Sequence, residues 1–219
     1  MQSFFQEELT KLRKRIMKMF VLAGSQLDRA FQSFTNRDFE INETALKNEN
    51  RIDKLDIKID KLCQRIFALA QPVATDLRFI MSSLRIGNEL ERIGDIAFEI
   101  IGRSEVVRPY PETLEEFNIT GLFREVNELA NRSAEAYTNG NSELAKEILN
   151  SCKKTEESCK SAFNEIISQM TKKSQVILIA TDLILIIRDL ERIFHHLENI
   201  AESVVFIVEG KRLKHQGQQ

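Results

Sequence analysis

Hydrophobic residues recur at intervals of three and four along almost the whole chain. Near the start, Leu9, Leu12, Ile16 and Phe20 follow this spacing, which places them on one face of a helix. The same pattern predicts six long helices, over residues 5–34, 40–69, 74–102, 112–138, 143–170 and 175–209. The segments between them are short and rich in turn-forming residues: Asn36–Asp38, Gln71–Pro72, Arg108–Pro111 and Asn139–Ser142. The pattern therefore predicts an all-α protein.

The two halves of the chain resemble each other. Leu90–Ile93 reads Leu-Glu-Arg-Ile, and the same four residues return 100 positions later as Leu190–Ile193. The Pro-rich segment at 108–111 lies close to the middle of the chain, and we place an internal boundary there. We predict two tandem, pseudo-symmetric, antiparallel three-helix bundles, over residues 1–108 and 109–219.

Composition narrows the class of protein further. The 219 residues include only 8 Gly and 3 Pro, too few for the frequent turns of an all-β sandwich or barrel. The 31 Lys and Arg are offset by 33 Asp and Glu. A nucleic-acid-binding domain usually carries a basic excess, so we expect no nucleic-acid partner.

Three features bear on the cellular compartment. The N-terminus has no apolar stretch of signal-peptide length, so we expect the mature chain to start here. The most apolar segment, Val176–Leu190, is interrupted by three charged residues, which predicts a buried helix and no membrane insertion. The three cysteines are odd in number and form no C-x-x-C pair, so we expect a reducing, cytoplasmic location.

Carboxylates form a line on the helix predicted over residues 40–69. At about 100° per residue, the line falls within about 80° and borders the hydrophobic stripe. Its members are Glu49, Asp53, Asp56, Asp60 and Cys63, while Lys54, Lys58, Lys61 and Arg65 lie on the far side. Because like charges one turn apart repel, an acidic line beside a packed surface calls for a compensating cation.

A second acidic pair lies on the helix predicted over residues 74–102. This helix is apolar on nearly all sides, so Glu91 and Asp95 are expected to be at least partly buried. A buried carboxylate must be protonated, paired or metal-bound. The pairs Glu49/Asp53 and Glu91/Asp95 could therefore supply four oxygen ligands to one divalent ion or a small cluster.

The corresponding positions in the second half offer different donor atoms. They are Cys152, Glu156, Glu191 and His195, a mixed sulfur, oxygen and nitrogen set that suits Zn or Fe better than Mg or Ca. A solvated face with nothing bound remains the alternative for the acidic line of the first half, and buried structural thiols and a packed histidine remain alternatives to metal binding in the second half.

Several segments together resemble the PhoU family of phosphate-signalling regulators, over essentially the whole chain. They are Cys63–Ile66, Gln71–Arg78 and Leu90–Asp95 in the first half, and Leu190–Ile193, Asn199–Glu202 and Val208–Lys211 in the second. The second half departs from the family pattern. Phe194 and His195 stand where the family usually has Gly-Asp, and Cys152 stands where it usually has an acid.

The resemblance implies a cytoplasmic, non-enzymatic adaptor that represses the phosphate-starvation response when phosphate is ample. Its implied partners are a phosphate-sensing histidine kinase and the high-affinity phosphate ABC transporter, and family members are commonly dimers. The family also binds multinuclear iron or other divalent metals at E(D)-x-x-x-D motifs. Carried over to this sequence, these motifs are Glu49/Asp53 and Glu91/Asp95, with iron expected and zinc as an alternative.

A di-iron-type carboxylate enzyme or metal-storage bundle is the alternative from another functional class. Such oxidases usually present Glu-x-x-His on two helices. The residues three positions before His195 and His196 are Arg192 and Ile193, so neither histidine completes this motif. The sequence also lacks a Gly-rich phosphate loop and a nucleophile elbow. We therefore favour the adaptor and expect no enzymatic activity.

Overall fold

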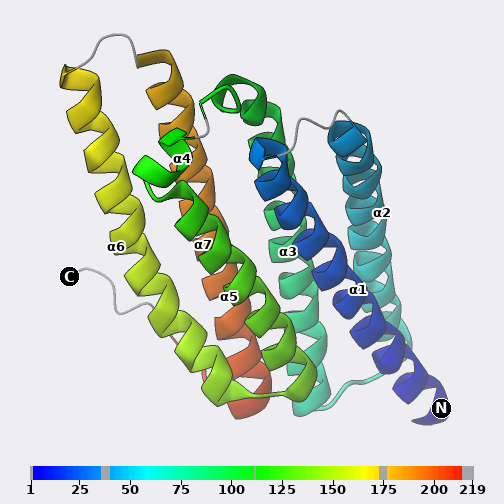
Figure 1. The fold of residues 1–219 in the computed structure, drawn as a ribbon. Coiled ribbons are helices and arrows are strands. Elements are labelled where there is room, and N and C mark those ends of the chain that lie inside the picture. Colours follow the sequence, from blue (N-terminus) through cyan, green and yellow to red (C-terminus); the bar gives the residue numbers. More distant parts are fainter. Residues whose placement is uncertain (1, 36–39, 111, 173–176, 214–219) are drawn as a thin grey trace.

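The computed structural model describes residues 2–35, 40–110, 112–172 and 177–213, and over these residues the chain is helical with no strand. The helices are α1 (Gln2–Thr35), α2 (Glu40–Leu69), α3 (Ala74–Val107), α4 (Glu112–Glu116), α5 (Ile119–Asn139), α6 (Ser142–Lys172) and α7 (Ile177–Glu209). The six long ones lie side by side, and those that follow one another along the chain run antiparallel (Figure 1). The all-α prediction of two tandem three-helix bundles is confirmed.

One predicted helix is wrong in its continuity. The expected single helix over residues 112–138 is split into α4 and α5 by a turn at Phe117 and Asn118. Asn118 has φ 53° and ψ 28°, a left-handed conformation that Asn tolerates better than most side chains. The turn lets the buried ring of Phe117 join the core. The α3 helix also continues beyond its predicted end at residue 102, whereas the expected turn at residues 36–38 lies outside the described residues.

The two bundles share one hydrophobic core. Helices α1, α2 and α3 form one bundle and α5, α6 and α7 form the other, with α3 against α7 and α1 against α5 (Figure 1). Phe123 of α5 packs on two rings of α1, at 5.5 Å from the Phe31 centroid and 5.6 Å from that of Phe34. Tilted aromatic pairs at these distances are favourable. The division of the chain at residue 108 stays a prediction.

Polar contacts also join α3 to α7. Asp189 is buried on α7 and accepts a hydrogen bond from Arg103 of α3 at 3.3 Å. Nearer the other end, Nδ1 of His196 lies 2.7 Å from a carboxylate oxygen of Glu89. These contacts fix the register between the two halves. Within the described ranges, no helix is both long enough and apolar enough to span a bilayer.

Candidate metal centre

Two glycines allow α2 and α3 to approach closely. A methyl group on Gly94 would lie 2.7 Å from Cδ1 of Ile52, and one on Gly87 would lie 3.4 Å from Cγ2 of Ile59. The two glycines are seven residues apart, as are the two isoleucines, so the contacts follow one seam between antiparallel helices. This seam runs directly beside the acidic positions and determines how close their carboxylates come.

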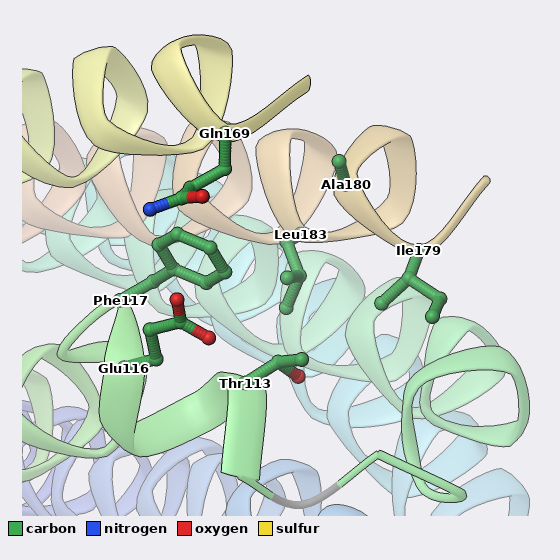
Figure 2. A pocket seen from close by; sticks show the side chains of 7 residues that line it. All are labelled: Thr113, Glu116, Phe117, Gln169, Ile179, Ala180 and Leu183. Atoms are coloured by element: carbon green, nitrogen blue, oxygen red, sulfur yellow. The ribbon is translucent and has the colours of Figure 1, made fainter. Parts of the chain in front are cut away.

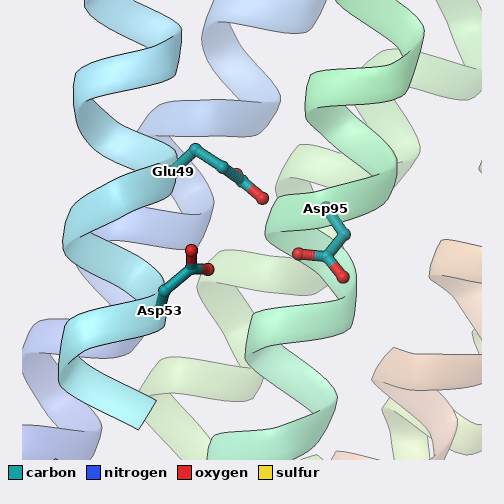
Figure 3. A group of neighbouring side chains, drawn as sticks. All are labelled: Glu49, Asp53 and Asp95. Atoms are coloured by element: carbon teal, nitrogen blue, oxygen red, sulfur yellow. The ribbon is translucent and has the colours of Figure 1, made fainter. Parts of the chain in front are cut away.

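Three carboxylates from these two helices converge. Glu49 and Asp53 lie one turn apart on α2, and Asp95 lies opposite them on α3 (Figure 3). One carboxylate oxygen from each of the three lies within 4.8 Å of the others. Two of the residues are half-buried and Asp53 is exposed, so the group lies at the edge of the core and is open to solvent on one side. In the part of the chain that the structure describes, this is the one cluster of three such side chains.

The fourth predicted ligand, Glu91, lies one turn along α3 and outside this group. Its side chain is half-buried, as the sequence predicted, and one of its oxygens lies 3.4 Å from Nε of Arg92. The same guanidinium reaches Asp95 at 3.3 Å, so Arg92 supplies one partly exposed positive charge beside the cluster. Glu91 still acts electrostatically on the cluster, because its charge raises the pKa of Glu49.

Burial and mutual repulsion oppose the ionisation of Glu49. Burial is the main cause, and a hydrogen bond with Asp95 and the charges of Asp95, Asp53 and Glu91 add to it. Together they raise the pKa of Glu49 from 4.5 to about 8. The pKa of Glu91 is also raised, by burial first and by Asp95 second. Without a cation, this site therefore retains a proton near neutral pH.

Asp56 belongs to the same acidic region, although the predicted ligand set does not include it. Burial raises the pKa of Asp56, with further contributions from Asp60 and Asp53. Its Oδ1 atom and the Oε2 atom of Glu49 are buried and have no hydrogen-bond partner among the described residues. Its position on the predicted acidic line was the signal that could have identified it. Buried oxygens without partners are costly unless a proton, water or cation satisfies them.

This donor set fits a hard cation. Carboxylate oxygens suit Mg²⁺, Mn²⁺ and iron, and partly solvated sites leave room for water ligands. A divalent cation would replace the proton on Glu49, and it could coordinate the two buried oxygens that have no hydrogen-bond partner. Glu49, Asp53 and Asp95 would hold it, with Asp56 and Glu91 within one turn of them along α2 and α3.

The predicted second-half residues meet around one small recess between α6 and α7. Its lining includes all four of them: Cys152, Glu156, Glu191 and His195. Their charges are already balanced on their own helices. Glu156 pairs with Lys160 at 2.7 Å, and Glu191 pairs with Arg188 at 2.8 Å. Burial raises the pKa of the Cys152 thiol to about 12, so the thiolate that a metal would bind is disfavoured.

The sequence model of the PhoU domain matches the chain twice, over residues 16–103 and 119–204. The chain belongs to the PhoU family. The first match contains the α2–α3 carboxylate cluster, and the second contains the mixed recess on α6 and α7.

Individual PhoU proteins match over nearly their full lengths. A phosphate-specific transport system accessory protein PhoU homolog of Aquifex aeolicus is 30% identical over 210 residues, which cover 96% of this chain and 95% of the relative. The phosphate-specific transport system accessory protein PhoU of Escherichia coli is 27% identical and covers 97% of this chain, with 88% of its own length matched. The crystal structure of PhoU from Pseudomonas aeruginosa superposes with a TM-score of 0.89 at 28% identity, covering 94% of this chain and 100% of that one.

A further recess lies away from both sets of acids, between α4, α6 and α7 (Figure 2). Its volume is about 50 Å³, and Phe117, Ile179 and Leu183 form much of its wall. Among the described residues that line it, Glu116 is the one titratable group. This recess therefore lacks the convergent donors that distinguish the α2–α3 cluster.

Proposed function

We propose that this PhoU-family chain is a regulatory accessory protein of a phosphate transport system. The observation that carries this proposal is the match to the Aquifex aeolicus accessory protein along nearly the whole of both chains. A match confined to one helical repeat would support only a shared building block. The double match to the PhoU domain extends the relationship to both halves.

More specifically, we propose that the protein is a cytoplasmic repressor of the phosphate-starvation response. It would act when phosphate is ample, as a homodimer, by contacting a phosphate-sensing histidine kinase and the phosphate ABC transporter. Two properties support an adaptor in a reducing compartment. Its long helices offer extended surfaces for partners, and its buried cysteines, Cys63, Cys152 and Cys159, are free thiols, as in proteins of a reducing compartment.

The carboxylate cluster would give this adaptor a metal-dependent structure. Glu49 and Asp53 hold the α2 side and Asp95 holds the α3 side, so binding fixes the two helices to one another. A bound divalent or trivalent cation, iron first and zinc or manganese as alternatives, would supply the positive charge that these acids lack. Glu49 releases its proton when the cation enters, and the first bundle becomes more rigid as a result.

The regulatory proposal is tested by deleting the gene in its host. A reporter for phosphate-starvation genes should then be expressed in phosphate-rich medium, and a plasmid copy of the wild-type gene should restore repression. Unchanged repression in the deletion strain would reject the regulatory role. Relief of repression without restoration by the plasmid would assign the effect to a neighbouring gene.

The metal proposal is tested by elemental mass spectrometry of the purified protein. The double variant Glu49→Gln/Asp95→Asn should lose most of the bound metal, because it removes charge from both sides of the cluster. The matched variant Glu156→Gln/Glu191→Gln changes two acids of the second recess and should retain it. Equal metal content in the wild type and the first variant would exclude the α2–α3 site.

A carboxylate-bridged enzyme remains the second candidate, and the carboxylate cluster is the observation that favours it. The two functions differ in turnover. Iron-loaded protein that consumes oxygen catalytically with a reductant would indicate an enzyme, whereas an adaptor should show no turnover above that of Glu49→Gln/Asp95→Asn.

A further inference from the structure

Charge is strongly segregated on α2. The acids that line the candidate metal centre face α3, and a row of cations lies toward α1. At about 100° per residue this row falls within about 80°. It consists of Arg51, Lys54, Lys58, Lys61 and Arg65, and no acid interrupts it. The net charge of −2 therefore hides a helix with two oppositely charged sides.

A groove between α1 and α2 contains three of these five cations. We call it the basic groove; it is lined by Arg15 of α1 and by Lys58, Lys61, Leu62 and Arg65 of α2. Its volume is about 250 Å³, and Leu62 is the one residue of its lining without a charge. Four cations around a concave surface of this size create a strong positive potential, because a groove between low-dielectric walls focuses the field.

The two arginines of the groove are held in place. Arg15 donates a hydrogen bond to the backbone carbonyl of Lys58 and thus spans from α1 to α2. Arg65 pairs with the carboxylate of Glu8, which is 1% exposed and also accepts from Lys11 at 2.8 Å. Glu8 is therefore already neutralised by two cations. Lys58 and Lys61 are exposed and have no ion-pair partner among the described residues.

The size and shape of the basic surface limit what fits it. From Arg51 to Arg65 the cationic row extends fourteen residues along α2, roughly 21 Å at 1.5 Å per residue. A single phosphate ion would engage only part of this length. A flat membrane would contact the rims and leave the concave floor of the groove uncovered. An elongated anionic chain matches the length of the row and follows its concave surface, where Leu62 is only 2% exposed.

We propose that the basic groove is the docking site for an acidic segment of a partner protein. This segment is a helix with carboxylates every three to four residues, and it lies along the cationic row. The proposal rests on the proposed adaptor function, which requires a partner, and it places that partner on the α1–α2 face. Docking relieves the repulsion among four neighbouring cations, whereas the opposite side of α2 remains available for metal.

Peptide binding to the full chain tests the proposal. The probe is a fluorescein-labelled helical peptide of about fourteen residues, matched to the length of the row, with Glu at every third and fourth position among alanines. Fluorescence anisotropy should show binding that weakens as sodium chloride is raised from about 50 mM to about 300 mM, because salt screens exposed charges. A peptide with Gln at each Glu position should not bind.

Charge reversal assigns the binding to the groove. Lys58→Glu/Lys61→Glu should weaken binding of the acidic peptide by about tenfold or more, because two attractions become repulsions. The matched control Arg124→Glu/Lys154→Glu changes net charge equally at exposed positions on α5 and α6 and should bind within about twofold of wild type. All four substitutions are on exposed helix positions, and circular dichroism verifies that both variants are folded.

Three outcomes overturn the docking proposal. Equal losses in the two variants would show a general charge effect, and no binding of the acidic peptide to the wild type would show that the groove has no such ligand. Tighter binding to phosphatidylglycerol vesicles or to single-stranded DNA would identify a different occupant. The peptide assay needs no host, so its failure can be distinguished from failure of the gene-deletion test. If the acidic peptide does not bind but gene deletion relieves repression, only the docking site is rejected. If the peptide binds but gene deletion leaves repression unchanged, only the proposed function is rejected.

Discussion

The metal-free protein should lose stability as pH rises through neutrality, and Glu49 should be the cause. Burial first, and then Asp95, Asp53 and Glu91, raise the pKa of Glu49 from 4.5 to about 8. Between these two values the folded chain holds a proton that the unfolded chain has released. Folding therefore takes up a proton in this range, so the free energy of unfolding must fall with increasing pH. The decline should stop above about pH 8, where the folded state also loses the proton.

The size of this effect follows from the shift. Each pH unit within the window changes the free energy of unfolding by about 1.4 kcal/mol, so two units between about pH 6 and about pH 8 give a ceiling of about 3 kcal/mol. Water reaches the cluster on the side of exposed Asp53 and reduces the penalty. We expect a loss of about 1–2 kcal/mol over this interval.

Urea unfolding followed by circular dichroism, in the presence of a chelator, measures this dependence. Glu49→Gln removes the titrating group and should make the free energy of unfolding nearly independent of pH over the same interval. Glu157→Gln, at an exposed position of α6, should behave like the wild type. Adding a divalent cation should flatten the wild-type profile, because the cation takes the place of the proton. A wild-type profile that rises with pH, or one that Glu49→Gln leaves unchanged, would refute the reasoning.

Three other predictions concern the scaffold. Glu8→Gln should lower the free energy of unfolding by about 1–3 kcal/mol at pH 7. Lys11, with Arg65, holds the pKa of buried Glu8 below 4.5, so the stabilisation by the Glu8 carboxylate is present above that value and is lost as pH falls. Urea unfolding at about pH 7 and about pH 3 should show that the difference in free energy of unfolding between the wild type and Glu8→Gln shrinks at the lower pH. A difference that stays constant would contradict the pairing. Phe123→Ala should cost about 3–5 kcal/mol in the same assay, because the ring fills the α1–α5 contact, and a cost below about 1 kcal/mol would show that this contact is loose. Asn118→Ala should lower the melting temperature and Asn118→Gly should not, because only the former disfavours the left-handed backbone; equal effects would contradict that conformation.

Most of the fold could be predicted from hydrophobic periodicity, because each long helix buries one continuous stripe. The start of α3 and the ends of α2 and α7 agree with prediction, since Pro72 and the change to polar residues mark them. The interruption between α4 and α5 could not be predicted in this way. Neither Gly nor Pro marks it, and the hydrophobic spacing continues through Phe117 and Asn118. The left-handed Asn118 depends on tertiary packing of the Phe117 ring.

The candidate site was predictable in composition and less so in geometry. The acidic line identified Glu49 and Asp53, and the apolar surroundings of α3 identified Asp95 as partly buried. Which carboxylates meet depends on the register of α2 against α3, and that register is set by Gly87 and Gly94 against two isoleucines. Helical periodicity assigns each side chain an angle around its own helix and gives no height relative to the next helix. For that reason the sequence could not tell that the oxygens of Glu49, Asp53 and Asp95 converge while Glu91 lies one turn along α3, and its role as a fourth ligand stays a prediction.

The two repeats therefore share a backbone plan and differ in how their acids are balanced. In the second repeat a metal would first have to displace Lys160 and Arg188 from the carboxylates, and then remove a proton from a thiol whose pKa is about 12. In the first repeat the equivalent acids have Arg92 as their nearby cation, and a proton on Glu49 with a pKa of about 8 is the main competitor. The pKa of Glu49 lies roughly four units below that of the Cys152 thiol, so removing the proton from Glu49 costs about 5 kcal/mol less, before solvent relaxation reduces the difference. The two halves thus differ in two ways: Cys152 and His195 replace two of the four acids in the second half, and Lys160 and Arg188 pair with the two acids that remain there.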